Sequence, residues 1–408
     1  MRYYLLLFFG FLLSISILKS QDDWGYTLYG YVKTDVMLDT RQTVSAREGH
    51  LLLYPANKLE TNGVDANEGI NFNILSIQSR FGAKIKAPDF LGAKSSGIME
   101  AEFFGSSNAV TGGVRLRVGV VKLDWGSHEF MAGQNWTPLF IEEAFAKTIS
   151  FNTGVPFVAF GRSPQVRYTY KPGKFKFHLS ALSERDFQST GPAGETSSYL
   201  RNAGLPMLNL GANYDDGTIF LAANASYKEI KPRLITDGGT IDPAKVIDEN
   251  KAKGFVTNVL ARYTTTNFFV TASALYGQNT HNLLMIGGYA VKSVSPDNGM
   301  WEYTPINTGS GWIDMQYGKD LTVGFFGGYT KNLGAEDEIT GSYYSRGKDI
   351  DYVYRASPRI SYRTGKTQLA AEFEYTTAAY GTNDNMGKVV DSKEVANLRV
   401  LLAAIIYF

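Results

Sequence analysis

Arginines recur at alternate positions in several segments of this sequence. In GVRLRVGVVKLDW, residues 113–125, Arg115 and Arg117 share one parity. The other parity holds Val114, Leu116, Val118 and Val120. A guanidinium group binds carboxylate or phosphate oxygens through paired hydrogen bonds. Arginines gathered on one face of a strand therefore predict a surface that attracts anions.

The residue patterns needed for enzymatic chemistry are sparse. The chain contains no cysteine, which excludes disulfides, cysteine nucleophiles and cysteine–metal sites. Its four histidines, His50, His128, His178 and His281, stand in no recognisable motif. Neither the Gly-x-Ser-x-Gly nor the His-Glu-x-x-His pattern occurs. We therefore expect no enzyme, no cofactor and no metal site.

The elements that would position the arginines are β-strands. The same alternation runs through QVRYTYKP (165–172) and KTQLAAEFEYTT (366–377), and side chains along a strand point to opposite faces. Each such segment therefore has one polar and one apolar face. We predict sixteen strands, at approximately 24–38, 70–86, 95–105, 113–124, 128–135, 165–172, 174–184, 206–215, 217–228, 253–264, 267–277, 309–318, 320–329, 350–364, 366–377 and 394–408.

The links between these strands alternate between short and long. Short links such as WGS (125–127), DDG (215–217) and TGK (364–366) have the composition of hairpin turns. The long links are 39–69, 136–164, 185–205, 229–252, 278–308, 330–349 and 378–393. An even number of strands with short turns at one end and long loops at the other is typical of a transmembrane barrel. We predict an all-β fold, an antiparallel up-and-down β-barrel of about sixteen strands with both termini in the periplasm.

The two ends of the sequence agree with this reading. Residues 1–20 have one early arginine followed by an apolar run, which predicts a signal peptide, with residues 21–408 forming a single barrel domain. The charges, 40 Lys+Arg against 39 Asp+Glu, give no reason to expect nucleic acid as a partner. After residue 20 no stretch is apolar enough for a membrane helix.

The last stretch, EVANLRVLLAAIIYF (394–408), is apolar nearly to its final residue. We assign Asn397 and Arg399 to the lumen and the opposite parity to lipid. That lipid-facing parity holds Leu398, Val400, Leu402, Ala404, Ile406 and Phe408. A final Phe after such a strand resembles the sorting signal of bacterial outer-membrane proteins. The alternative, a buried strand of a soluble protein, explains neither the alternating loops nor the signal peptide.

The same parity argument gives the residues that would line the pore. We predict arginines at the lumen positions Arg80, Arg115, Arg117, Arg167, Arg262, Arg355, Arg359 and Arg399. Charges inside a narrow pore with low-dielectric walls select ions more strongly than surface charges do. We therefore expect a preference for anions such as small carboxylates. The alternative is that these arginines pair with lumen acids and leave no net bias. Those acids are Glu100, Glu102, Glu372 and Glu374.

The link 136–164, WTPLFIEEAFAKTISFNTGVPFVAFGRSP, is apolar for a loop. Loops exposed to solvent are usually polar, so this one is expected to pack against the protein. We predict that it folds inward as a constriction loop, with Glu142 and Glu143 facing the arginines. An outward cap packed on neighbouring loops or on another subunit is the alternative.

The stretch VRLRVGVVKLDWGSHEFMAGQNWTPLF, residues 114–140, resembles the DcaP-type porins of Gram-negative outer membranes. In that family two such strands lead through a Gly-Gln-x-Trp turn into the constriction loop, here Gly133, Gln134 and Trp136. The resemblance implies a sixteen-stranded homotrimer that passes small, often negatively charged solutes. Some members carry a periplasmic coiled coil before the barrel. This sequence departs from them, because its first predicted strand starts at Trp24, soon after the signal peptide.

These inferences lead to one expected function and one alternative. We expect a multi-pass porin in the outer membrane of a Gram-negative bacterium, which passes small anionic or polar solutes by passive diffusion. Its other partners would be outer-membrane lipid, lipopolysaccharide and further copies of the chain. The alternative is a barrel with a blocked pore that serves as a structural subunit of a larger outer-membrane complex.

Overall fold

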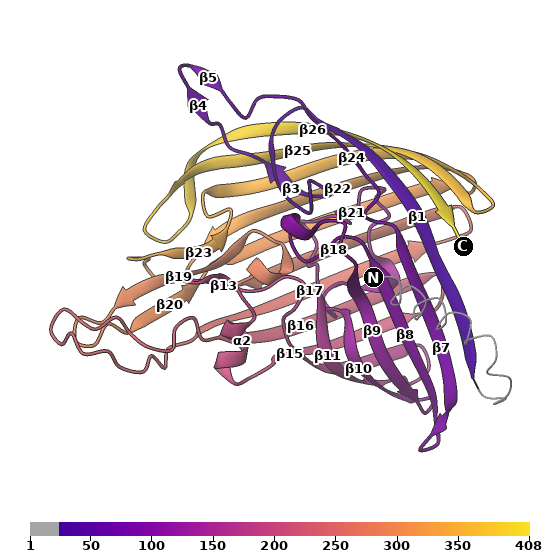
Figure 1. Ribbon diagram of the computed structural model, residues 1–408, viewed down its shortest axis with the longest axis horizontal. Helices are drawn as coiled ribbons and strands as arrows, with labels where there is room; N and C mark the ends of the chain where they lie inside the picture. Colours follow the sequence, from indigo (N-terminus) through magenta and orange to yellow (C-terminus); the bar gives the residue numbers. More distant parts are fainter. Residues whose placement is uncertain (1–23) are drawn as a thin grey trace, which may run out of the picture.

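Sixteen antiparallel strands form one closed barrel in the computed structural model, which describes residues 24–408 (Figure 1). The predicted signal peptide, residues 1–20, lies outside the described residues. The spanning strands are β1 (Gly25–Asp39), β6 (Asn71–Leu75) with β7 (Arg80–Phe90), β8 (Ala93–Glu102), β9 (Arg115–Asp124), β10 (His128–Trp136), β11 (Arg162–Tyr170), β12 (Phe175–Leu182), β15 (Met207–Asp215), β16 (Ile219–Ile230), β17 (Ala252–Thr264), β18 (Phe268–Gln278), β21 (Asn307–Gly318), β22 (Leu321–Gly334), β24 (Ile350–Thr364), β25 (Thr367–Asn383) and β26 (Val389–Tyr407).

The barrel closes where β1 meets β26. Their register runs from Tyr31 opposite Tyr407 to Asp39 opposite Arg399. On its other side β1 pairs with both β6 and β7, which are therefore two halves of one strand interrupted at 76–79. Closure pairs the backbone groups of both edge strands, which a sheet in lipid requires. The predicted closed barrel of sixteen antiparallel strands is confirmed.

Short turns and long loops separate to opposite ends of the barrel. In Figure 1 the short turns lie on the right and the long connections on the left. Gly25, the first residue of β1, and the C-terminal Phe408 lie at the end with the short turns. The predicted long link 378–393 is wrong, because β25 and β26 continue to pair as far as Asn383 and Val389. Only residues 384–388 turn between them.

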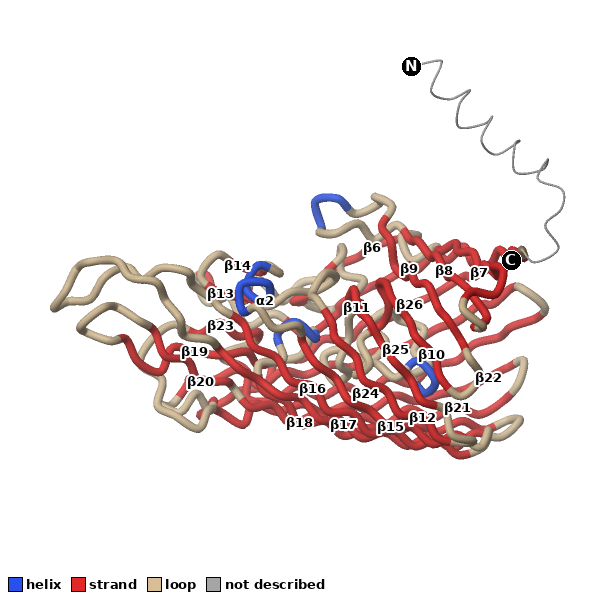
Figure 2. The backbone as a smooth tube through the Cα atoms, turned by 90° about the horizontal axis from the view of Figure 1, so that it is seen from below, coloured by secondary structure: helices blue, strands red, loops and turns tan. Residues whose placement is uncertain are grey.

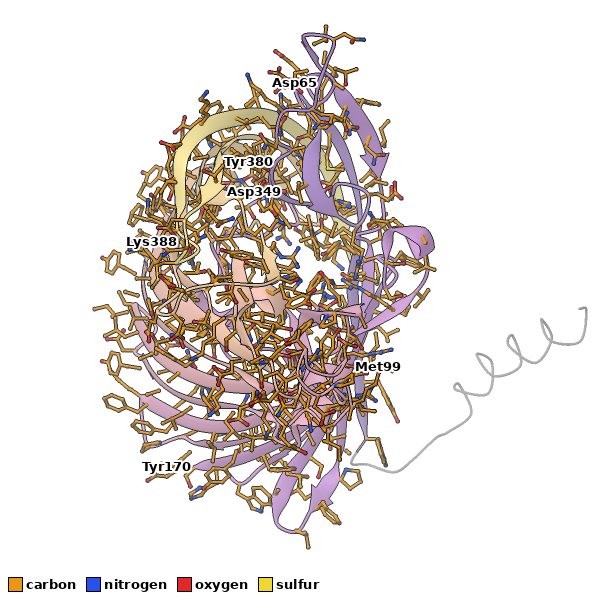
Figure 3. All side chains as sticks on the ribbon, turned by 90° about the vertical axis from the view of Figure 1, so that its left-hand side faces the viewer. Asp65, Met99, Tyr170, Asp349, Tyr380 and Lys388 are labelled. Atoms are coloured by element: carbon orange, nitrogen blue, oxygen red, sulfur yellow. The ribbon has the colours of Figure 1, made fainter. Side chains whose placement is uncertain are left out.

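The outer wall is apolar and the inner wall is largely polar. Exposed residues of β26 include Leu398, Leu402 and Ile406, and these point outward as the alternation predicts. Figure 3 looks into the long-loop end and places Met99 and Tyr170 on the outside of the ring, with Tyr380 inside. Such a large exposed apolar belt matches a lipid-facing surface.

One predicted parity is wrong in β9. Val118 and Val120, expected on the lipid side with Leu116, are buried inside the barrel. The reason is a β-bulge. Glu100 pairs with Val118 but the next residue of β8 pairs with Leu116, so β9 holds one extra residue at Arg117. A bulge of one residue moves every later side chain to the opposite face.

The long connections contain only short elements of their own. The helical ones are η1 (Asn108–Val110), η2 (Glu142–Ala144), α2 (Ser198–Ala203) and η3 (His281–Leu283), drawn in blue in Figure 2. The strands are β2 (Thr43–Ala46), β3 (Leu51–Pro55), β4 (Glu60–Thr61), β5 (Val64–Asp65), β13 (Thr190–Gly191), β14 (Gly194–Glu195), β19 (Gly287–Val294), β20 (Trp301–Pro305) and β23 (Tyr343–Arg346). Strands β20, β19 and β23 form a separate sheet. No helix in residues 24–408 is both long and apolar enough to cross a membrane.

Candidate pore and its lining

The connection 137–161, between β10 and β11, lies inside the barrel. On one wall, side chains of Asn258, Arg262 and Thr271 donate hydrogen bonds to main-chain oxygens of the loop at 2.7–3.0 Å. On another wall, the Glu372 carboxylate accepts hydrogen bonds from the main-chain N–H groups of Ile149 and Ser150, at 2.6 and 2.7 Å. The loop therefore reaches across the lumen from β17 and β18 to β25.

Aromatic side chains explain why this loop turns inward. Trp136 stacks on Phe140 with ring centroids 4.1 Å apart, and both rings meet Phe160 edge-on. Phe151 and Phe157 are also buried. Aromatic rings of this size bury a large apolar area, and the edge-on geometry adds to it. The loop thus builds an apolar core inside the barrel, where a solvated loop could not place these rings.

Three of the predicted arginines share two buried carboxylates. Arg117 donates hydrogen bonds to Glu100 and Glu102, both at 2.6 Å. Arg115 binds Glu102 at 2.6 Å, and Arg80 lies 3.6 Å from Glu100 and 3.7 Å from Glu102. Glu102 is fully buried. These guanidinium groups are therefore largely neutralised within the wall, as the alternative of paired charges expects for them.

Four more of the predicted arginines lie against carboxylates of other strands or loops. The shortest N–O distances are 2.6 Å for Arg359 with Asp314, 2.7 Å for Arg399 with Asp39, 3.2 Å for Arg262 with Asp215 and 3.6 Å for Arg355 with Glu374. Arg355 also donates to the main-chain oxygen of Val155 in the inward loop at 2.8 Å. Arg262 and Arg355 thus join the wall to the inward loop, and all four arginines contribute little free charge.

Arg167 differs from the other predicted arginines. It donates hydrogen bonds to Gln165 at 2.8 Å and to the main-chain oxygen of Trp136 at 3.2 Å. No carboxylate of residues 24–408 lies within 4.0 Å of its guanidinium group or of the Lys122 ammonium group. Two basic side chains on β9 and β11 are thus left with free positive charge.

These two basic side chains line a pair of connected cavities on the short-turn side of the inward loop. The cavities measure about 500 and 200 Å³ and share Lys122, Asn135, Trp136, Phe140 and Glu142 in their walls. Arg167 and Glu143 line the smaller one. The structure therefore brings Glu142 and Glu143 to the same space as Arg167, and Glu142 also lines the larger cavity with Arg80 and Arg117. The remaining predicted arginines line neither cavity.

Glu142 is the titratable group of this space. Its side chain reaches the water of the cavity but is enclosed by the barrel, and this loss of solvation, with the neighbouring Glu143 carboxylate, raises the pKa of Glu142 to about 7. Arg167 and Lys122 oppose the rise. The acid is therefore only partly charged at neutral pH.

A second connection also enters the lumen, which the sequence did not lead us to expect. Arg355 donates hydrogen bonds to the main-chain oxygens of Leu52 and Leu53 at 3.1 and 3.2 Å, and Tyr380 donates to that of Pro55 at 2.7 Å. The His50 ring lies 2.8 Å from the Asp35 carboxylate. The unbroken apolar run LLLY, residues 51–54, is the signal that could have identified this segment.

Other residues of the lining were also missed. Arg162 is fully buried and binds Asp186 at 2.8 Å, while Asp186 also binds Arg115 at 2.7 Å. Lys122 lay outside the predicted set, although the bulge in β9 turns it inward. Asp186 belongs to a connection without periodicity, so the sequence carries no signal for it.

Comparison with solved structures places this geometry among known barrels. The chain superposes on the outer-membrane channel DcaP of Acinetobacter baumannii with a TM-score of 0.70 at 18% identity, covering 96% of this chain and 99% of that one. The fold is that of a porin. The outer-membrane protein OmpT of Vibrio cholerae gives a TM-score of 0.56 at 13% identity, with 96% and 99% covered. OmpF of Salmonella typhi gives 0.53 at 11%, with 94% and 97% covered.

These comparisons establish the fold alone, because the sequence identities are low. No family model matches the sequence, and no curated protein matches it. The resemblance inferred from residues 114–140 thus agrees with the fold found over nearly the whole chain.

Proposed function

We propose that this chain is an outer-membrane porin through which small hydrophilic solutes diffuse, with a preference for anions such as small carboxylates. One observation carries the proposal. The cavities under the inward loop hold Arg167 and Lys122, two basic groups with free charge, opposite the partly protonated Glu142. A narrow aqueous space with surplus positive charge favours anions.

The charge of the cavity walls supports the direction of the preference. Six basic side chains line the two cavities, and four of them lie within 4.0 Å of carboxylates, which leaves Lys122 and Arg167 as the surplus facing Glu142. The basic ones are Arg80, Arg117, Lys122, Arg167, Lys171 and Lys176, and the acidic ones are Glu100, Glu129, Glu142 and Glu143. Because low-dielectric walls surround this space, a small surplus acts more strongly than it would on an open surface. The loop 137–161 would serve as the constriction.

The architecture of the barrel supports an orientation in the membrane. We infer that the short-turn end, with both chain ends, faces the periplasm, and that the long loops face outward from the outer membrane of a Gram-negative bacterium. A homotrimer is the assembly that we propose, and one similar barrel, OmpT of Vibrio cholerae, has a solved trimer form. Lipid and lipopolysaccharide would surround the outer wall.

Planar-bilayer recording of the folded, purified protein under a salt gradient tests this proposal. We expect an open channel whose reversal potential favours anions. The double variant Lys122→Ala and Arg167→Ala should shift that potential toward cations. Lys319→Ala removes one positive charge from an exposed short turn and should leave the reversal potential unchanged. A cation-favouring or unselective wild type would contradict the anion preference but not the channel.

The blocked barrel remains the second candidate, because one observation favours it. An apolar core lies in the lumen, built from the inward loop, from segment 51–54 and from wall residues that reach as far as Phe220 beside a short turn. It joins Phe157 and Phe160 to Leu51, Tyr54 and Leu284. Absence of conductance in a demonstrably folded barrel would favour this structural role over diffusion.

A further inference from the structure

A groove opens on the outer wall of the barrel, away from the pore. It has a volume of about 580 Å³ and lies between α2 and strands β10, β11 and β12. Ala132, Val166 and Ala181 stand side by side across these strands and face outward. Pro164 and Ser183 follow toward the long-loop end. Four of these five side chains are small, whereas the neighbouring strands carry large residues. The outer wall is therefore hollowed at this place.

The helix α2 lies toward the long-loop end (Figure 1), where its residues form the rim of the groove. Its Leu200 is buried against the barrel, while Arg201 is exposed and lines the groove. The helix ends at Gly204, whose left-handed conformation (φ 74°) turns the chain back toward β15. The groove therefore has an apolar floor and a rim that carries a positive charge.

This rim has more positive than negative charge. Lys251 donates a hydrogen bond to the main-chain oxygen of Ala203 in α2 at 2.9 Å and lies 3.1 Å from Glu229. Lys253, which is 64% exposed, lies 3.9 Å from the same carboxylate. Arg201 has no carboxylate within 4.0 Å among residues 24–408. Lys251 and Lys253 thus share one acid, and Arg201 on α2 adds a third positive charge.

The neighbouring strands show where the membrane boundary lies. Leu208, Tyr227 and Phe255 continue the outward row of Ala181 across β15, β16 and β17. Each is partly exposed on the outer wall. Aromatic residues gather at the membrane–water interface of such barrels. The basic rim, one row further toward the long loops, therefore lies at the depth of lipid headgroups.

The opposite side of the barrel lacks this surplus of positive charge. There Lys331 is bound to Asp351 at 2.8 Å, and Glu394 accepts a hydrogen bond from Tyr352 at 2.7 Å. On that side the basic group has an acid of its own.

We propose that the groove binds one phosphorylated lipid of the leaflet at the long-loop end. An acyl chain would lie on Ala132, Val166 and Ala181, and a phosphate group would be held by Arg201 and Lys253. Basic side chains near the surface attract anionic headgroups. A hydrocarbon chain on the apolar floor would bury apolar surface, which favours binding. With the long loops outward, as proposed above, this lipid is a phosphorylated glycolipid of the lipid A type.

Native mass spectrometry of the folded, full-length mature protein in detergent tests this site. The probes are lipid A with two phosphates, the same lipid A without phosphate, and phosphatidylethanolamine. We expect the phosphorylated lipid A to bind most tightly. Arg201→Ala combined with Lys253→Ala should weaken that binding about tenfold or more, while Lys331→Ala should leave it unchanged. Equal binding of lipid A without phosphate would overturn the proposal.

The floor of the groove is tested separately. Ala181→Phe should fill the groove and weaken binding without unfolding the barrel, as heat-modified migration on a gel would show. The chain contains no cysteine, so Ala181→Cys introduces a single thiol. A disulfide-linked dimer of that variant would show a second copy in the groove and overturn the lipid assignment. Conductance plays no part in these readouts, so their failure would leave the porin proposal standing.

Discussion

At the scale of single residues, Glu142 is the acid through which pH can change the pore. Its pKa of about 7 means that the carboxylate loses its charge as the pH falls from 8 to 6. The charges that face it are Glu143 on the same loop, Arg167 on β11, Lys122 on β9 and Glu100 on β8. We therefore predict that anion selectivity rises as the pH falls through 7, measured as the reversal potential under a salt gradient.

Glu142→Gln is the matched control for this prediction. The amide cannot ionise, so the selectivity of the variant should stay near the low-pH value of the wild type from pH 6 to 8. A wild type whose reversal potential is constant over this range would contradict the assignment. So would a variant that keeps the pH dependence, because another group would then be responsible.

Residue by residue, the alternation of the sequence could predict the face of a side chain but not its partner. Arg115 and Glu102 lie on neighbouring strands, so their pairing was foreseeable as an alternative. Asp314 reaches Arg359 from β21 across β22, and this contact depends on side-chain length and barrel curvature. Four of the seven paired arginines lie against acids that strand parity identifies, while the acids that pair with Arg262, Arg359 and Arg399 are marked by no local pattern.

At the scale of elements, the inward loop depends on a few anchors. Glu372 accepts hydrogen bonds from Ile149 and Ser150 of the loop and from Ser357 of β24, all within 2.7 Å. Hydrogen bonds to a charged group contribute about 1.5–3 kcal/mol each. We predict that Glu372→Ala loosens the loop and raises single-channel conductance and current noise in planar bilayers.

Gln368→Ala on the same strand is the control, because Gln368 hydrogen-bonds Ser361 and Tyr407 and not the loop. Its conductance should match that of the wild type. If Glu372→Ala folds fully and still conducts as the wild type does, the loop is held by its aromatic core alone. That result would show that Glu372 is not needed to hold the constriction loop in place.

The strands themselves were predictable where one feature of the sequence dominated. Alternating faces and turn residues identify strands such as β15 and β24 to within one residue of their ends. The bulge could not be located at Arg117, because the alternation continues through it as far as Val120; only the adjacent pair Val120 and Val121 signals a change of parity. The break at 76–79 was also missed. There the main-chain N–H group of Lys33 donates a hydrogen bond to the Ser79 hydroxyl group at 3.0 Å, in place of a bond between strands.

At the scale of the whole molecule, the two halves of the lumen differ. The short-turn half holds the charged cavities, and the apolar core, in which the inward loop meets segment 51–54, extends from the long-loop half as far as Phe220 beside a short turn. Porins need a continuous aqueous path, so the apolar core controls how much the channel conducts. The diffusion channel and the blocked barrel therefore differ in conductance. Segment 43–55 is the element whose removal distinguishes them.

We predict that replacing residues 43–55 by a short Gly-Ser linker raises single-channel conductance several-fold. The segment covers Arg355 and Tyr380 on the lumen wall, so its removal opens the long-loop half to water. A wild type that conducts weakly, with a variant that conducts strongly and keeps the anion preference, supports a narrow diffusion channel. A silent wild type with a conducting variant makes 43–55 a plug. If neither conducts although both barrels are folded, loop 137–161 alone closes the lumen, and the structural role becomes the better account.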